Sequence, residues 1–325
     1  MSALSGKTVL VTGGAGFIGS HLIDRLVSEN PKKVIVIDNL SLGREENLES
    51  AKISLGDKLA CYWFDACDLE KVQKVIEDEN VEVVYDLAVI PLPASLKDPY
   101  NNVLSNVSLS LVLCELLRLK KFDTLIHFSS SEVYGTAQYV PIDEGHPFVT
   151  STPYAASKAG GDQLCLSYAK TFDLDIRILR PFNNYGPRQN SREFAGIIPI
   201  VMNNYHRKEP VTIFGDGEQT RDLIFVEDTA EAAVRMYENE STRGLVTNIG
   251  SGIETSINKL VATMLEQLGE SDWEVNHTDP RPSDVRRHCA GVKRAQELIN
   301  FEPQTSLDIG LKQTIDWYLS SGENG

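Results

Sequence analysis

Four consecutive polar side chains stand where a buried strand should end. Ser129, Ser130, Ser131 and Glu132 directly follow the apolar residues 124–128, which are typical of a strand in a protein core. Hydroxyl and carboxyl groups are costly to bury at such a position unless they are hydrogen-bonded. Ser130 can hydrogen-bond a substrate hydroxyl, and Glu132 can accept a proton. The segment therefore predicts one edge of an active site.

A glycine-rich turn predicts a phosphate-binding loop. Gly13, Gly16 and Gly19 lie between an apolar strand and a helical pattern that begins with Phe17 and Ile18. Glycines in this context permit a tight turn and let backbone N–H groups approach a pyrophosphate at the helix N-terminus. The alternative is a structural glycine turn in another α/β protein.

Asp38 and Asn39 follow the next predicted strand, and Asp38 stands 19 residues beyond Gly19. A carboxylate at this distance accepts hydrogen bonds from a ribose diol and repels a 2′-phosphate. The pattern favours NAD over NADP, with a simple strand-end carboxylate as the alternative interpretation.

Tyr154 and Lys158 are four residues apart, so they share one face of a helix for which Thr152 is the expected N-cap and Pro153 the first residue. A free phenol has a pKa near 10, and its use as a base at neutral pH requires a fall of roughly three units, or about 4 kcal/mol. An adjacent ammonium together with an oxidised nicotinamide can supply this stabilisation. The same spacing also occurs on ordinary amphipathic helices.

The elements that position these residues alternate between strands and helices. Strands are expected at residues 7–12, 34–38, 83–88, 124–129 and 176–180, and helices at 17–28, about 70–79, about 103–120 and about 154–172. Near-continuous apolar strands separated by helices predict an α/β fold with a doubly wound parallel (Rossmann) sheet.

The composition changes after Pro181: glycines and prolines become frequent, and the predicted helices and strands become shorter. We expect a second, smaller α/β lobe that binds the substrate. The predicted division gives residues 1–180 and about 222–243 to the NAD-binding domain, and about 181–221 and 244–325 to the second domain.

Composition excludes several classes of partner. The chain has 325 residues, 31 Lys and Arg against 46 Asp and Glu, and a net charge of −15, so nucleic acid is not an expected partner. Its five cysteines form no CxxC pair and no cluster with ligand spacing, so we expect reduced thiols and no metal. Without an apolar run of 18 residues or a signal peptide, we expect a cytoplasmic protein with no membrane contact.

Taken together, the chain resembles the extended short-chain dehydrogenase/reductase family, specifically its nucleotide-sugar epimerases, dehydratases and decarboxylases. The resemblance covers nearly the whole chain. Its motifs are the glycine turn, Asp38-Asn39-Leu40, Asp65, Leu87-Ala88, residues 129–135, Tyr154 with Lys158, Arg180-Pro181-Phe182-Asn183, Gly186-Pro187-Arg188, Gly215-Asp216-Gly217, Arg221-Asp222 and Arg281-Pro282-Ser283-Asp284.

The resemblance implies further site residues and partners. NAD would be reduced and reoxidised within one turnover, and the substrate would be a nucleotide-diphosphate sugar. The additional cofactor-binding residues would be Asp65, Ala66, Leu87, Ala88, Asn106, Ser129 and Pro181. The substrate-binding residues would be Asn183, Arg188, Arg221, Arg281 and Asp284, although solvated surface arginines are an alternative. The helices at about 103–120 and 154–172 would form a homodimer, although packing within one chain would explain their apolar face equally well. Residues 89–95, with two prolines, depart from the family pattern.

Glu132 separates the reaction outcomes. After oxidation at the sugar C4, hydride return to the other face gives a 4-epimer and needs no further base. Proton removal from C5 with loss of the C6 hydroxyl, then hydride return to C6, gives a 4-keto-6-deoxy sugar. Loss of a C6 carboxylate as carbon dioxide gives a pentose derivative. Glu132 suits the C5 base, with Ser131 assisting the leaving oxygen. The sequence therefore favours a 4,6-dehydratase, with a 4-epimerase, a decarboxylase, a purely structural Glu132 and a non-catalytic NAD sensor as alternatives.

Overall fold

The computed structural model describes residues 2–191, 196–281 and 285–321. The strands are β1 Thr8–Thr12, β2 Lys33–Asp38, β3 Leu59–Trp63, β4 Val83–Asp86, β5 Thr124–Phe128, β6 Asp175–Pro181, β7 Asn183–Tyr185, β8 Val211–Phe214, β9 Thr220–Phe225, β10 Val246–Ile249, β11 Glu254–Ser256 and β12 Val275–Thr278. The α-helices are α1 Phe17–Val27, α2 Glu49–Leu55, α3 Leu69–Glu79, α4 Leu92–Ser95, α5 Pro99–Arg118, α6 Pro153–Phe172, α7 Ile197–Arg207, α8 Val226–Glu238, α9 Ile257–Gln267, α10 Lys293–Ile299 and α11 Leu307–Ser321. Short 3₁₀ turns are η1 Glu45–Leu48, η2 Gly56–Lys58, η3 Ser131–Tyr134 and η4 Glu240–Thr242.

The larger lobe is built on a seven-stranded parallel sheet in the order β10-β6-β5-β4-β1-β2-β3. The chain winds outward in both directions from β1 and β4, which confirms the predicted doubly wound Rossmann sheet. The prediction omitted β3. This strand lies at the edge of the sheet, and its residues, although apolar or aromatic, are half-buried or exposed.

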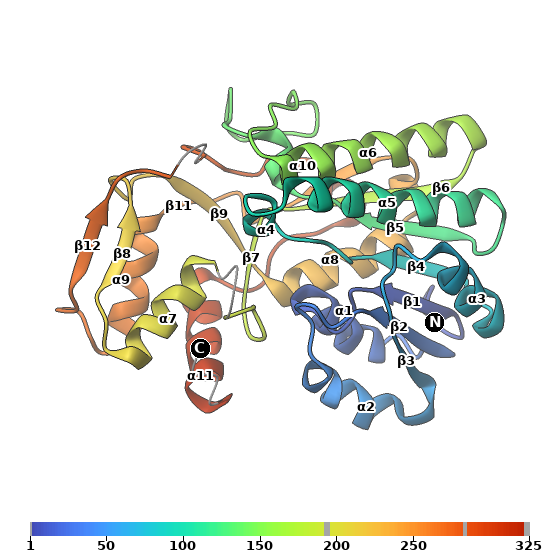
Figure 1. Cartoon of the computed structure of the whole chain (residues 1–325), viewed down its shortest axis with the longest axis horizontal. Coiled ribbons are helices and arrows are strands. Elements are labelled where there is room, and N and C mark those ends of the chain that lie inside the picture. Colours follow the sequence, from blue (N-terminus) through green and yellow to red (C-terminus); the bar gives the residue numbers. More distant parts are fainter. Residues whose placement is uncertain (1, 192–195, 282–284, 322–325) are drawn as a thin grey trace.

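Helices cover both faces of this sheet (Figure 1). Side chains of α1, α2, α8 and α10 pack on one face, and those of α3, α5 and α6 on the other. Burial of both faces explains why the central strands read as uninterrupted apolar runs.

The smaller lobe holds the sheets β11-β9-β7 and β12-β8, and its core includes side chains from α7, α9 and α11 (Figure 1). Two strands pair differently from what the expected division of the chain suggests. β10 pairs in parallel with β6, with Val246 opposite Ile178, so it belongs to the large sheet. β9 instead pairs with β7 and β11 in the smaller lobe, whereas α8, which follows it, packs on the large sheet.

The two long helices begin at capping residues that fix their positions. The Oγ1 of Thr152 accepts a hydrogen bond from the N–H of Ala155, and Pro153 is the first helical residue of α6, as predicted. α5 begins earlier than predicted, because Asp98 caps it by accepting from the N–H of Asn101 at 3.0 Å.

Among residues 2–191, 196–281 and 285–321, no helix combines the length and apolar character that a membrane crossing requires. The same residues contain no group of three or more His, Cys, Asp or Glu side chains that could hold a metal ion.

Candidate active site

The glycine turn between β1 and α1 is closely packed against the loop that follows β4. Gly13 has a φ of +66°, and a Cβ there would lie 2.8 Å from the backbone nitrogen of Ala88. A Cβ at Gly19 would collide with the carbonyl oxygen of Gly13. Both positions therefore require glycine for the turn to keep its shape.

Asp38 at the end of β2 is tied to this turn. Its Oδ2 accepts a hydrogen bond from the N–H of Ala15 at 3.0 Å, and its Oδ1 accepts from the N–H of Leu40 at 2.8 Å. Burial raises the pKa of the carboxyl, and the two backbone donors oppose that rise. The carboxylate is thus held in place beside the glycine turn.

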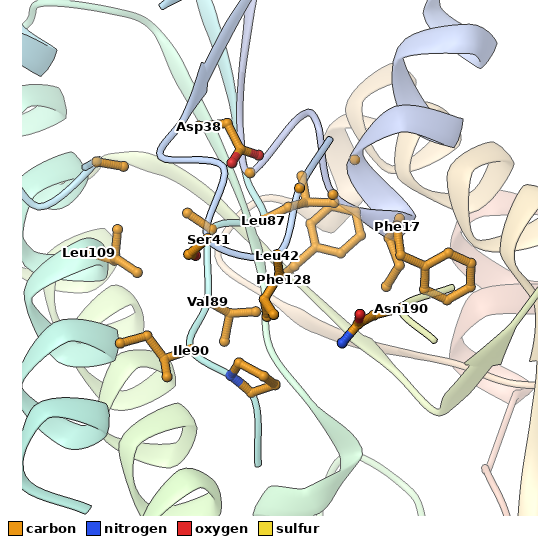
Figure 2. Close-up of a pocket in the computed structure, with 18 of the residues that line it drawn as sticks. Phe17, Asp38, Ser41, Leu42, Leu87, Val89, Ile90, Leu109, Phe128 and Asn190 are labelled. Carbon is orange, nitrogen blue, oxygen red and sulfur yellow. The ribbon is translucent and has the colours of Figure 1, made fainter. Parts of the chain in front are cut away.

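A cavity of about 390 Å³ opens over the carboxyl ends of the strands. Figure 2 shows Asp38 at one end, Phe17 with Asn190 on one side, and Ile90 with Leu109 on the other. Every residue predicted to bind the cofactor lines it except Asn106: Gly13, Gly16, Phe17, Ile18, Gly19, Asp38, Asn39, Asp65, Ala66, Leu87, Ala88, Ser129, Tyr154, Lys158 and Pro181. Ser41, Leu42, Gly43 and Asn190 also line the cavity and were not predicted, although the Ser-Leu-Gly segment close after Asn39 is typical of a turn.

Asn106 was predicted to line the cofactor cleft, but it acts on the backbone behind it. The side-chain Oδ1 accepts from the N–H of Ile90 at 2.8 Å, and the Nδ2 donates to the carbonyl of Ile90 and the hydroxyl of Ser157, both at 3.0 Å. Asn102 donates a further bond to the Ile90 carbonyl at 2.9 Å. Two buried amides therefore fix the loop that carries Val89 and Ile90 into the cavity.

Ser130, Tyr154 and Lys158 converge at one wall of the cavity. Ser130 hydrogen-bonds the Tyr154 phenol. Lys158 is buried, with 6% of its surface exposed, and its Nζ donates to the carbonyl oxygen of Phe128 at 2.5 Å. The end of β5 and the first turns of α6 thus bring together the hydroxyl, phenol and ammonium that the sequence predicted.

The pKa of Tyr154 does not follow the expectation from its spacing to Lys158. This pKa is raised to about 12, mainly by burial; the hydrogen bond with Ser130 lowers it, and the charges of Glu132 and Asp162 also raise it. The Lys158 ammonium instead donates to β5, and burial lowers its own pKa. The groups of the chain by themselves therefore keep the phenol protonated near neutral pH.

Glu132 lies on η3, two residues after Ser130, and is half-buried. Its N–H donates to the Oγ of Ser130 at 3.2 Å, and its negative charge raises the pKa of Tyr154. Ser131 is buried, and neither it nor Glu132 lines the first cavity. Glu132 is nevertheless electrostatically linked to the phenol.

A second cavity, of about 420 Å³, lies in the smaller lobe. Asn183, Arg221 and Arg281 line it, and the Arg281 guanidinium stacks on the ring of Phe214 at 4.1 Å from its centroid. Asn184 and Gln189 line both cavities, so the two adjoin.

Two other predicted substrate residues stand apart from this second cavity. Arg188 lines the first cavity, and its Nη1 lies 2.7 Å from a carboxylate oxygen of Asp24 on α1. Asp284 lies outside the described residues.

The sequence analysis did not single out His288, which is buried between the two lobes. Burial lowers its pKa to about 4, with a further contribution from the charge of Arg221. The neutral ring therefore accepts from the Asn183 amide at Nδ1 and donates from Nε2 to the Ser131 carbonyl, both at 3.3 Å. His288 connects the second cavity with η3.

The family model described as "NAD dependent epimerase/dehydratase family" matches residues 9–250. The chain belongs to this family. It is also 35% identical over 316 residues to a UDP-glucose 4-epimerase of Mycolicibacterium smegmatis, covering 97% of this chain and 99% of the relative.

Solved structures of the family have the same fold. One is a UDP-glucose 4-epimerase from Thermotoga maritima with UDP-glucose, 34% identical, with a TM-score of 0.90 over 97% of this chain and 100% of that one. Another is a dTDP-glucose 4,6-dehydratase from Bacillus anthracis in complex with NAD, 27% identical, with a TM-score of 0.86 over 98% of each chain.

The first cavity fits the family's cofactor, NAD. A Cβ at Gly13 or Gly19 would fill the turn that approaches a pyrophosphate, and the Asp38 carboxylate lies where a ribose diol requires an acceptor. The chain is an NAD-dependent enzyme of the nucleotide-sugar epimerase/dehydratase group.

Gly19→Ala is expected to destabilise the protein by about 1–3 kcal/mol and to abolish measurable NAD binding, because the new Cβ displaces the turn. Gly160→Ala on α6 is the matched control, since its Cβ would meet only Val107 Cγ2 at 3.6 Å, an ordinary contact. Thermal unfolding and calorimetric titration with NAD measure both effects. Normal NAD affinity in Gly19→Ala would show that the glycine turn does not bind the cofactor.

Asp38→Asn is expected to weaken NAD binding about tenfold, because an amide replaces a charged acceptor. It should also improve NADP binding, because the repulsion of a 2′-phosphate disappears. The readout is the ratio of the two dissociation constants. Asp65→Asn, in the same cavity, serves as the control and should leave that ratio near its original value. An unchanged ratio in Asp38→Asn would remove Asp38 from cofactor selection.

Proposed function

We propose that the protein is a nucleotide-diphosphate-hexose 4,6-dehydratase. NAD, held by the glycine turn and Asp38, would supply a hydride acceptor and donor and a positive charge in the cavity that Tyr154 lines. The residues of the chain supply the proton transfers: Tyr154 takes the proton of the sugar C4 hydroxyl, Ser130 hydrogen-bonds that hydroxyl, and Lys158 contributes positive charge. Glu132 would then remove the C5 proton, which the 4-keto group acidifies, and this proton would leave with the C6 hydroxyl as water, assisted by Ser131. Return of the hydride to C6 and of the proton held by Tyr154 to C5 would complete the 4-keto-6-deoxy sugar.

The position of Glu132 is the observation that favours dehydration over epimerisation. Its negative charge raises the pKa of Tyr154, which opposes the use of that phenol as a base in the first step. A 4-epimerase needs only the Tyr154 proton transfer, so a carboxylate here would hinder it without a compensating role. A dehydratase needs a second base close to the first, because C5 is bonded to C4. The adjacency of Glu132, Ser130 and Tyr154 meets that need.

The two adjoining cavities support the class of substrate. A sugar in the first cavity can extend its diphosphate and nucleoside into the second, where Arg221 and Arg281 supply positive charge. Such local cations matter in a chain whose net charge is −15.

A 4-epimerase is the second candidate, because the relatives of highest identity named above are UDP-glucose 4-epimerases. The deciding experiment incubates the purified protein with a panel of nucleotide sugars and weighs the products by mass spectrometry. Dehydration removes the mass of one water, decarboxylation that of one carbon dioxide, and epimerisation leaves the mass unchanged but changes the retention time. A product of unchanged mass as the sole outcome would overturn the dehydratase proposal.

A further inference from the structure

A row of buried polar side chains crosses the large sheet beneath the active site. Thr12 on β1, Asp86 on β4 and His127 on β5 are direct neighbours in the strand register. The Oγ1 of Thr12 donates to Oδ1 of Asp86 at 2.9 Å, and Nδ1 of His127 lies 2.8 Å from Oδ2 of Asp86. Each side chain is at most 2% exposed. A carboxylate is thus buried in the sheet with two hydrogen-bond partners.

α6 places a second buried carboxylate against the same imidazole. Oδ2 of Asp162 accepts from the hydroxyl of Ser129 at 2.7 Å and from Nη2 of Arg180 at 2.6 Å. Its Oδ1 faces Nε2 of His127 at 3.7 Å, and within the described part of the chain neither of these two atoms has a hydrogen-bond partner. His127 therefore stands between two carboxylates.

Lys158 lies on the same face of α6 as Asp162, one turn closer to Tyr154. Its ammonium donates a hydrogen bond to the backbone carbonyl of Phe128, the residue directly after His127. One oxygen of Asp162 also forms an ion pair with Arg180, at 2.6 Å. Asp86 makes no ion pair with an arginine or lysine side chain among the described residues, although a buried charge needs compensation.

We infer that Asp86 and Asp162, which lie on either side of His127, form the counterion of the Lys158 ammonium and hold it charged beneath the cofactor cavity. They are positioning residues, since they act through Lys158 and do not contact the substrate. Burial by itself lowers the pKa of Lys158, and Asp86 and then Asp162 are the largest opposing influences. Without them, the ammonium beside the reacting phenol would lose its proton more easily.

Two variants test the inference by the direction in which they shift the pH profile of kcat/KM. The groups that face Lys158 are Asp86 on β4 and Asp162 with Cys165 on α6, and His127 and Arg180 contact the two carboxylates. Asp86→Asn removes the first charge, so Lys158 should deprotonate earlier. The alkaline limb of the pH profile of kcat/KM should move about one pH unit lower.

The acid limb distinguishes the two carboxylates. Asp162 raises the pKa of Tyr154 as well as that of Lys158. Asp162→Asn should therefore move both limbs to lower pH, whereas Asp86→Asn should leave the acid limb in place. A readout that needs no turnover is the near-ultraviolet tyrosinate absorbance of the NAD-loaded protein, with Tyr154→Phe as the blank. Its midpoint should fall in Asp162→Asn.

Asp228→Asn is the matched control. Asp228 is a buried carboxylate that accepts from the backbone N–H groups of Gln304 and Thr305, away from Lys158. Its loss should reduce stability but keep both limbs in place. Unshifted limbs in both test variants, or equal shifts in the control, would overturn the inference. The wild-type enzyme also tests it if a variant does not fold: an alkaline limb below about pH 8 would show that Lys158 is not held charged.

The inference needs only the family's NAD chemistry. The tyrosinate titration remains valid if the product proves to be an epimer, so a failure of the dehydratase proposal and a failure of this inference can be told apart.

Discussion

Tyr154→Phe is expected to lower kcat about 10³-fold with every nucleotide sugar, whichever product the wild-type enzyme forms. The phenol oxygen is the group that exchanges a proton with the C4 hydroxyl, and removal of a general base has effects of this size. Phenylalanine retains the ring and its packing, so the fold should survive. Steady-state product formation by mass spectrometry measures the loss.

The affinity for NAD provides the control for Tyr154→Phe. Because the glycine turn and Asp38, rather than the Tyr154 hydroxyl, are expected to hold the cofactor, the dissociation constant should change by less than about threefold. A Tyr154→Phe enzyme with turnover close to the wild type would remove the phenol from the mechanism. The protein would then need a different base at C4.

Glu132→Gln is expected to leave oxidation at C4 intact while it slows elimination at least about 10²-fold. The amide cannot accept the C5 proton, and its neutrality should lower the pKa of Tyr154, which favours the first step. The 4-keto sugar should therefore accumulate on the enzyme. A rise in the absorbance of reduced nicotinamide after substrate addition, without a dehydrated product, is the expected signature.

Glu132→Asp supplies the conservative comparison, since it retains a carboxylate and should recover part of the elimination rate. A structural role for Glu132 predicts something different: loss of oxidation and elimination together, with a lower melting temperature. Full dehydratase turnover in Glu132→Gln would exclude the carboxylate as the C5 base.

The pKa of Tyr154 could not be predicted from its spacing to Lys158 alone. An i,i+4 spacing places Lys158 near the phenol, and from that neighbourhood alone a lowered pKa is expected. In the folded chain the ammonium hydrogen-bonds the Phe128 carbonyl, and two carboxylates act on the phenol in the opposite direction. The sign of a pKa shift depends on all nearby charges, most of which come from other elements.

Local features were determined by the sequence alone. The glycine turn, the Thr152 cap and the Tyr154–Lys158 stripe depend on residues within one or two turns of each other, where dihedral preferences and helical period decide the geometry. The parallel sheet could be foreseen for a related reason, because strands buried on both faces must be apolar throughout.

Only the tertiary structure decided the rest. The edge strand β3 and the displaced strand β10 depend on pairing partners distant in the chain. The roles of Asn106, Arg188 and His288 were set by what the fold places against them, and so was the Asp86–His127–Asp162 row. Long-range contacts of this kind follow from strand order and helix packing, and a single sequence specifies them only through the complete fold.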